Sequence, residues 1–451
     1  MREVLARPEH VVTEWTGFFR ADALSAWMVL LISVVSLGSS LYAGGYFRRD
    51  LAAGAVTPGR VKEFFVLTPL FTTGMFLVVL ANNLGVMWFA LEATALSSVL
   101  LVALYNRSTS LEAAWKYVIL GSLGLALALF GTVFTYTAAV GKTPSETLPS
   151  FNWSHLMSIA GQLDPRMIKL AFVFAFVGYG AKAGLAPMHT WLPDAHSEAP
   201  SPTSAMLSGV SLKVALYALL RFHILTMACL GSSFSRTMLV VFGLGSMCLA
   251  APFILVQTNL KRLLAYSSLE HVGLICVGFG LNSPLTILGA LMHMGYHALT
   301  KPVLFFAAGN IHQSCHTLQI RLIGPGLARM LPLTVVCMSL AAVAAIGLPP
   351  FGLFFSEMTV LNGGFLEAHQ TGISMLVLAA LLASFCGILC QLARVLLGAP
   401  KVPRTSSVAR WDGIPAMGLM LGTLLVFSVW LPAPLLDLMN RAQGIIIGGK
   451  P

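Results

Sequence analysis

The sequence predicts an all-α protein that crosses a membrane about twelve times. Hydrophobic residues make up 57% of its 451 positions, and charged residues only 10%. A soluble domain carries about a quarter charged residues, so this chain has too few to cover a surface that faces water. We therefore exclude a soluble enzyme, a disordered chain and a nucleic-acid-binding protein, and expect the lipid bilayer as the surroundings.

Apolar segments close to the roughly 20 residues that span a bilayer account for the crossings. They cover residues 22–46, 63–82, 83–104, 114–140, 167–186, 202–226, 236–257, 263–280, 283–308, 332–368, 372–398 and 414–434. The tenth segment is too long for one straight helix and contains GLPPFG at 347–352, so we expect two half-helices around a break. The fifth runs into Gly184 and Pro187, which predicts a second break.

Basic residues predict the orientation in a cell inner membrane. An even number of spans places both termini on one side, where we count 10 Lys and Arg residues against 14 on the other side. Cytoplasmic loops carry the excess of Lys and Arg. We therefore expect the termini on the outer, periplasmic side.

The sequence predicts no cofactor and no metal. The seven cysteines stand singly, without a CxxC pair. Structural zinc sites and iron–sulfur sites usually contain such pairs. Neither a P-loop nor a GxGxxG motif after a strand is present.

Ionisable residues inside apolar segments are the candidate functional residues, because each costs several kcal/mol in hydrocarbon. They are Glu92, Lys182, Lys213, His271, His293, His297, Lys301 and Glu357. A structural role is the alternative for each: Glu92 could simply pair with a lysine, the lysines could reach the membrane surface, and His271 could be a hydrogen-bonded core residue.

The combination favours a lateral proton relay. Burial disfavours the charged form of a lysine, and a nearby glutamate favours it, so movement of the glutamate would switch the lysine between binding and releasing a proton. Histidine is suited to pass protons between such sites. His293, His297 and Lys301 are spaced by four residues and form one stripe on a helix.

The spacing also predicts an internal duplication. Glu92 precedes Lys182 by 90 residues, and His271 precedes Glu357 by 86. A five-helix unit repeated in tandem is inverted relative to its neighbour, as in many transporters. We expect a tail and first span at 1–62, a first repeat at 63–226, a second repeat at 227–398, and a last span and tail at 399–451, with one broken helix in each repeat.

Three sequence blocks resemble one known family. They are GYGAKAGLAPMHTWLPDAHSEAPSPTSAMLSGVSLKVALYALLRF, HMGYHALTKPVLFFAAGN and GLPPFGLFFSEMTVL. They are similar to the proton-pumping, antiporter-like subunits of respiratory complex I and of membrane-bound hydrogenases. The second block looks closest to component F of hydrogenase 4, and next closest to NADH-quinone oxidoreductase subunit M. Compared with the family's usual fourteen helices, we expect two N-terminal helices to be missing.

The resemblance implies roles by position. Glu92 matches the glutamate that pairs with the lysine of the first broken helix, here Lys182, and Lys213 matches the lysine of the next helix. The residues that match the central relay are His271, His293, His297 and Lys301. Glu357 matches the terminal group of the second broken helix. The family has no redox cofactor in this subunit and is driven by redox chemistry in peripheral and membrane partner subunits.

Three functions stay open from the sequence. The first is a proton-translocating subunit of a hydrogenase-4, formate hydrogenlyase or NADH-quinone oxidoreductase type of complex. The second is a subunit of a multi-subunit sodium/proton antiporter or of an inorganic-carbon uptake system. The third is an assembly subunit with vestigial charges.

Overall fold

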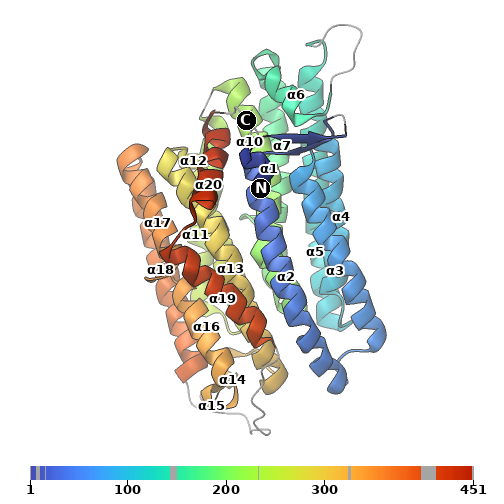
Figure 1. The fold of residues 1–451 in the computed structure, drawn as a ribbon, viewed down its shortest axis with the longest axis vertical. Coiled ribbons are helices and arrows are strands. Elements are labelled where there is room, and N and C mark those ends of the chain that lie inside the picture. The colour runs from blue at the N-terminus through green and yellow to red at the C-terminus, as the bar shows by residue number, and fades with distance from the viewer. Residues whose placement is uncertain are drawn as a thin grey trace.

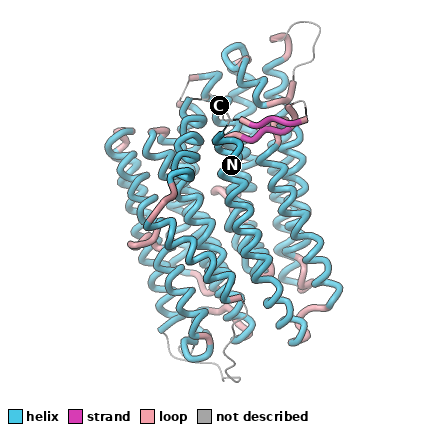
Figure 2. The backbone as a smooth tube through the Cα atoms, viewed as in Figure 1, coloured by secondary structure: helices cyan, strands magenta, loops and turns pink. Residues whose placement is uncertain are grey.

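The computed structural model describes residues 2–6, 11–15, 17–142, 150–231, 233–323, 327–397 and 413–448. Within these ranges the protein is a bundle of long helices with one small hairpin of strands at one end (Figures 1 and 2). The predicted all-α class is confirmed.

The first half of the chain contains the following elements. They are α1 Arg2–Ala6, β1 Val12–Glu14, β2 Phe19–Ala21, α2 Ala23–Ala52, α3 Pro58–Leu80, α4 Leu84–Val102, α5 Ser108–Ala139, α6 Trp153–Ser158, η1 Ala160–Gln162, α7 Pro165–Ala183, α8 Trp191–Glu198, α9 Ser201–Met206, η2 Leu207–Ser211 and α10 Leu212–Leu230. Strands β1 and β2 pair antiparallel, with Val12 opposite Ala21. This hairpin is not predicted from the sequence.

The second half is helical wherever the structure describes regular elements. They are α11 Phe234–Val256, α12 Leu260–Leu281, α13 Pro284–Cys315, α14 Ile320–Ile323, α15 Leu327–Met330, α16 Pro332–Ala345, α17 Gly352–Asn362, η3 Gly363–Glu367, α18 Thr371–Leu397, α19 Ile414–Val429 and α20 Ala433–Gly448. The predicted domain boundary at residue 399 lies outside the described residues.

All twelve predicted segments coincide with helices. Eight described helices are long and apolar enough to cross a membrane alone, counting α9 to α10 as one. A ninth span results if α19 and α20, bent by 78°, are counted together. Three of the predicted spans are too short or too polar to meet this criterion: α7, α13 and the α16–α17 pair. They contain the helix breaks or the polar residues, and they carry Lys182, His293 and Glu357.

Side-chain caps start several of the long helices where the sequence changes from polar to apolar. Asp22 accepts from the Ser25 backbone N–H at the start of α2. Asn83 and Asn259 do the same for α4 and α12, and Ser283 for α13. Such caps satisfy backbone donors that a helix leaves free at its first turn.

Both predicted breaks are confirmed. Helix α7 ends at Ala183, where Gly184 takes a left-handed conformation with φ of 78°, and α8 begins only at Trp191. Helices α16 and α17 are separated by residues 346–351. Two further irregularities were not predicted: η2 is a π-helical turn that ends two residues before Lys213, and η3 is a second such turn after α17.

Helix α13 occupies the centre of the bundle. It packs against α2, α9, α12, α16, α17, α19 and α20. Figure 1 shows α3, α4 and α5 on one side of the bundle and α11, α16, α17 and α18 on the other. The polar residues of α12 and α13 are therefore enclosed by protein, away from lipid.

Candidate functional site

Lys182 lies in the last turn of α7 and is buried, with 1% of its surface exposed. The C-terminal end of a helix carries partial negative charge, which favours a lysine there. Its Nζ donates to the Tyr117 hydroxyl on α5 at 2.5 Å, and that hydroxyl lies 2.9 Å from the Ser98 hydroxyl on α4. Lys182 thus has a tyrosine as its polar partner.

Glu92 lies on α4 and is only half-buried. Its carboxylate accepts a long hydrogen bond of 3.4 Å from Ser122 on α5. The ion pairs within 4.0 Å among the described residues do not include Glu92 with Lys182. The direct pair that the family resemblance implies is therefore absent in this conformation.

Lys213 is fully buried and lies 2.5 Å from Nδ1 of His297, which comes from α13. Its Nζ also donates to the carbonyls of Ser208 and Gly209, each at 2.7 Å. Both carbonyls belong to the π-helical turn η2, so this irregularity supplies acceptors that a regular helix keeps for itself. The turn thereby holds the lysine against α13.

Three histidine rings continue the line from Lys213. The ring of His297 lies edge-on to that of His271, with 5.0 Å between centroids. His271 Nδ1 is 3.0 Å from His293 Nε2, and His293 Nδ1 is 2.9 Å from the Ser356 hydroxyl on α17. All three rings are buried.

The hydrogen bonds indicate which nitrogen of each histidine ring carries a proton. Ser356 donates its hydroxyl to the Leu353 carbonyl at 2.9 Å, so it accepts from Nδ1 of His293. A neutral His293 then has its lone pair on Nε2 and accepts from Nδ1 of His271. One proton is therefore shared between the two rings.

Lys301 is fully buried two turns after His293. Its Nζ donates to the Ser267 hydroxyl and, at 3.2 Å, to the Leu264 carbonyl of α12. The neighbouring Ser268 hydroxyl lies 2.7 Å from that of Ser208. Ser268 donates to the same Leu264 carbonyl, and the carbonyl of Ser208 accepts from Lys213, so the two lysines contact one polar network of α12 and η2.

Glu357 lies in the second turn of α17 and is 6% exposed. The break between α16 and α17 makes room for its carboxylate: at Gly347, a Cβ atom would come 2.1 Å from Glu357 Oε2. A cavity of about 210 Å³ adjoins the carboxylate and is also lined by Glu270 and His271. That volume is enough for several water molecules.

Lys182 and Lys213 are not joined by a chain of hydrogen bonds among the described residues. The apolar side chains of Leu192 and Leu212 lie beside Gly184 in the break after α7, and both are fully buried. The structure brings seven of the eight predicted residues into the interior. Five of them form a line of neighbouring groups: hydrogen bonds join Lys213 to His297 and His271 to His293, a ring contact joins His297 to His271, and Glu357 lies within 4.8 Å of His271 and His293.

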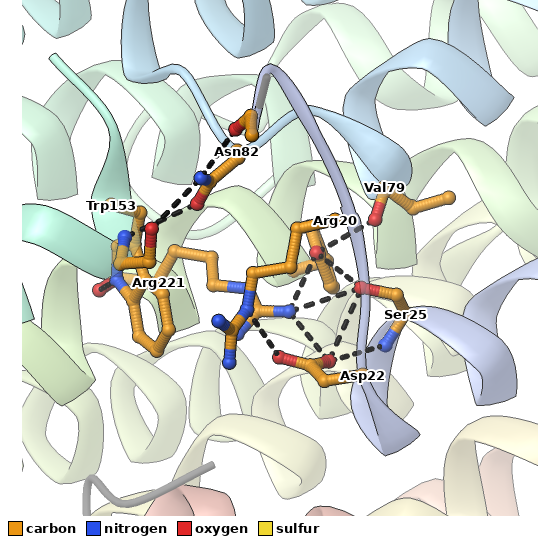
Figure 3. Close-up of polar contacts among 10 residues, drawn as sticks. Arg20, Asp22, Ser25, Val79, Asn82, Trp153 and Arg221 are labelled. Atoms are coloured by element: carbon orange, nitrogen blue, oxygen red, sulfur yellow. Dashed lines mark hydrogen bonds and ion pairs between the residues drawn. The ribbon is translucent and has the colours of Figure 1, made fainter. Parts of the chain in front are cut away.

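A second buried charge cluster, which was not predicted from the sequence, contains Arg20, Asp22 and Arg221 (Figure 3). Arg221 on α10 donates to Asp22 at 2.7 Å and to the Tyr217 hydroxyl at 2.8 Å, and its guanidinium lies 4.6 Å from the centre of the Trp153 ring. Arg20 lies 3.6 Å from the same aspartate. Both arginines belong to the ten basic residues that the charge count places in loops on the terminal side, but each is buried.

The signal for Arg221 was its spacing. Lys213, Tyr217 and Arg221 are four residues apart and form one stripe along α10. For Tyr117 and Ser356 no sequence signal was available, because a single tyrosine or serine in an apolar helix is common and their partners lie on other helices.

These features define a class: polytopic membrane proteins with a buried line of lysine, histidine and glutamate beside broken helices, as in antiporter-like subunits. The chain belongs to the family described as NADH:quinone oxidoreductase/Mrp antiporter, whose transmembrane model matches residues 81–383. The family resemblance seen in the sequence is confirmed.

Individual proteins agree with this assignment. A hydrogenase-4 component F homolog from Methylacidiphilum infernorum (isolate V4) is 38% identical over 385 residues, covering 85% of this chain and 80% of that protein. The structure of an archaeal respiratory membrane complex, the membrane-bound sulfane sulfur reductase, contains a chain with a TM-score of 0.83 and 25% identity, covering 97% of this chain and 85% of that one. The Mrp complex from Dietzia sp. DQ12-45-1b contains a chain with a TM-score of 0.82 and 20% identity, covering 97% and 88%, which shows a shared fold.

Proposed function

We propose that this chain is the proton-translocating membrane subunit of a redox-driven complex of the hydrogenase-4, formate hydrogenlyase or NADH-quinone oxidoreductase type. The observation that carries the proposal is the buried line from Lys213 through His297, His271 and His293 to Glu357. Buried ionisable groups are costly in a membrane and persist where they conduct ions or protons. The similarity to a hydrogenase-4 component F homolog supports the type of complex.

In this proposal, each group has a distinct task. Lys182 is the switching site and Glu92 its modulator, acting across Tyr117 in the conformation described above. Lys213, the three histidines and Lys301 carry protons along the bundle. Glu357 releases them into the cavity at the second broken helix.

The gap between Lys182 and Lys213 is the control point of the proposed path. Apolar Leu192 and Leu212 occupy the break beside Gly184, so proton transfer across it needs water. A movement of Glu92 toward Lys182 would favour the charged lysine, and its withdrawal would release the proton. In this proposal the contact of Lys182 with Tyr117 supports the withdrawn position of Glu92 for the conformation described above.

The internal duplication gives this path its two broken helices. We propose repeats at 63–226 and 227–398, with Lys182 at the break of the first and Glu357 at the break of the second. We also propose that the chain resides in a cell inner membrane with its termini outside. The excess of basic residues in the opposite loops supports this orientation.

Partner subunits supply the driving force in this proposal, which the similarity to a hydrogenase-4 component F homolog supports. The second candidate function is that of a subunit in a multi-subunit sodium/proton antiporter or an inorganic-carbon uptake system. The fold that this chain shares with a chain of the Mrp complex supports this second candidate function. Purification of the chain from membranes, with mass spectrometry of the co-purifying subunits, separates the two: hydrogenase or quinone-oxidoreductase subunits support the first.

The direct test is Lys182→Ala in the purified complex, reconstituted into vesicles that contain a pH-sensitive dye. We expect the complex to assemble and proton translocation to be lost. Translocation at wild-type rates would overturn the proposed role of Lys182.

A further inference from the structure

The part of the relay nearest α17 has the composition of a metal site. His271, His293 and Glu357 each offer one ligand atom, and these atoms lie within 4.8 Å of one another. Two histidines and one carboxylate are a common ligand set for Zn²⁺, which binds nitrogen and oxygen ligands at about 2.0–2.2 Å. Tetrahedral coordination at that length places ligands roughly 3.3 Å apart, so only small side-chain movements are required.

We propose that His271, His293 and Glu357 bind a divalent transition-metal ion of the Zn²⁺ type, and that the bound ion blocks the relay. The blocking effect rests on the function proposed above, whereas binding of the ion does not. The ion would take the position of the proton now shared between Nδ1 of His271 and Nε2 of His293, which are 3.0 Å apart.

The ring of His293 is already oriented by a hydrogen bond, as is usual for a histidine that binds a metal. A histidine that binds a metal normally donates its other N–H to an oxygen, which fixes the ring. His293 donates from Nδ1 to the Ser356 hydroxyl, and Ser356 is itself held by the Leu353 carbonyl. This arrangement leaves the lone pair of Nε2 directed at the proposed position of the ion.

The charges nearby are balanced for a divalent cation. Glu270 lies 3.9 Å from Nε2 of His271, so two carboxylates, Glu270 and Glu357, compensate the two positive charges. Lys213 and Lys301 oppose a cation when they are charged, and their Nζ atoms are held by backbone carbonyls, the Ser267 hydroxyl and, for Lys213, Nδ1 of His297. Binding of the ion would favour neutral lysines and so displace protons from the relay.

The cavity beside Glu357 gives the ion a route to the site. It has a volume of about 210 Å³ and is lined by Glu270, His271, Gly347 and Glu357, with the remainder from α16, the break after it, α17 and α18. Its carboxylates are of the kind that attract cations from water. The ion would therefore meet the ligands from the side of the second broken helix.

The test measures binding to the purified full-length chain in its complex, with Zn²⁺ and with Co²⁺ as a spectroscopic probe. Two exposed thiols one turn apart on α18, Cys386 and Cys390, could also bind these ions, so all variants are made in a Cys386→Ser/Cys390→Ser background. We expect one Co²⁺ per chain with the absorption of a tetrahedral site. His293→Gln and Glu357→Gln should each weaken binding more than tenfold.

The control variant is His312→Gln, which removes a histidine at the other end of α13 and should leave binding unchanged. Stoichiometric Co²⁺ binding that persists in His293→Gln or Glu357→Gln would overturn the proposal, as would the absence of saturable binding in the background protein. Because a misfolded variant would also lose the site, each must show the same size-exclusion profile as the background protein. The inhibitory effect is measured separately as Zn²⁺ inhibition of proton translocation by the background complex.

Discussion

Nζ of Lys213 lies 2.5 Å from Nδ1 of His297, which joins α10 to α13 at the centre of the membrane bundle. Both residues are fully buried, and the lysine has two further acceptors in the π-helical turn before it. The contact is the point where the lysine of the first half of the chain meets the histidines of the second.

His297→Gln should interrupt this contact. Glutamine retains a polar group but cannot bind and release a proton near neutral pH, so we expect proton translocation to fall more than tenfold while the complex still assembles. The measurement is the initial rate of vesicle acidification. His312→Gln, the same change at the end of α13, is the matched control, and equal rates in the two variants would remove His297 from the path.

Gly347→Ala should disturb Glu357. The added Cβ would lie 2.1 Å from the glutamate Oε2, and the φ of 67° disfavours alanine by about 1–2 kcal/mol. We expect lower thermal stability and slower proton translocation. Gly245→Ala on α11 has open space around the new Cβ and should change neither property; the same loss in both variants would contradict the role assigned to Gly347.

Tyr117→Phe should leave Lys182 buried without its hydroxyl acceptor. An unsatisfied buried polar group costs about 1–3 kcal/mol, so we expect lower stability in denaturant unfolding. Lys182→Met alone and the double variant Lys182→Met/Tyr117→Phe complete a double-mutant cycle. Strictly additive effects would show that the contact contributes nothing.

Arg221→Leu should destabilise the fold rather than act on the relay. It leaves Asp22 buried without its closest guanidinium, at a cost of about 3–5 kcal/mol. Adding Asp22→Asn should recover part of the stability, because the uncompensated charge is removed. A larger loss in the double variant than in Arg221→Leu would contradict this explanation.

The sequence predicted the fold class, the twelve helical segments and both breaks, because each depends on local composition. About twenty consecutive apolar residues form a membrane span independently of their tertiary contacts. In the same way, GLPPFG at 347–352 interrupts a helix through its own glycine and proline residues. The stripe of His293, His297 and Lys301 was equally local and lies on the protein-facing side of α13.

The partners of these residues could not be predicted. Lys182 contacts Tyr117 from 65 residues away, and His293 contacts Ser356 from 63 away, so no spacing rule applies. The absence of a metal site was predicted from the absence of cysteine pairs, whereas His271, His293 and Glu357 are brought together from three helices. Arg221 is one of the ten basic residues that the charge count places on the terminal side, yet Asp22 and Trp153 contact it in the interior.

The central claim is that the line from Lys213 to Glu357 carries protons. Its most direct test is proton translocation by the reconstituted complex with Lys213→Ala, measured alongside subunit composition and the redox activity of the same preparation. We predict an intact complex in which vesicle acidification falls to the level of protein-free vesicles. Acidification at the wild-type rate by a fully assembled Lys213→Ala complex would contradict the account.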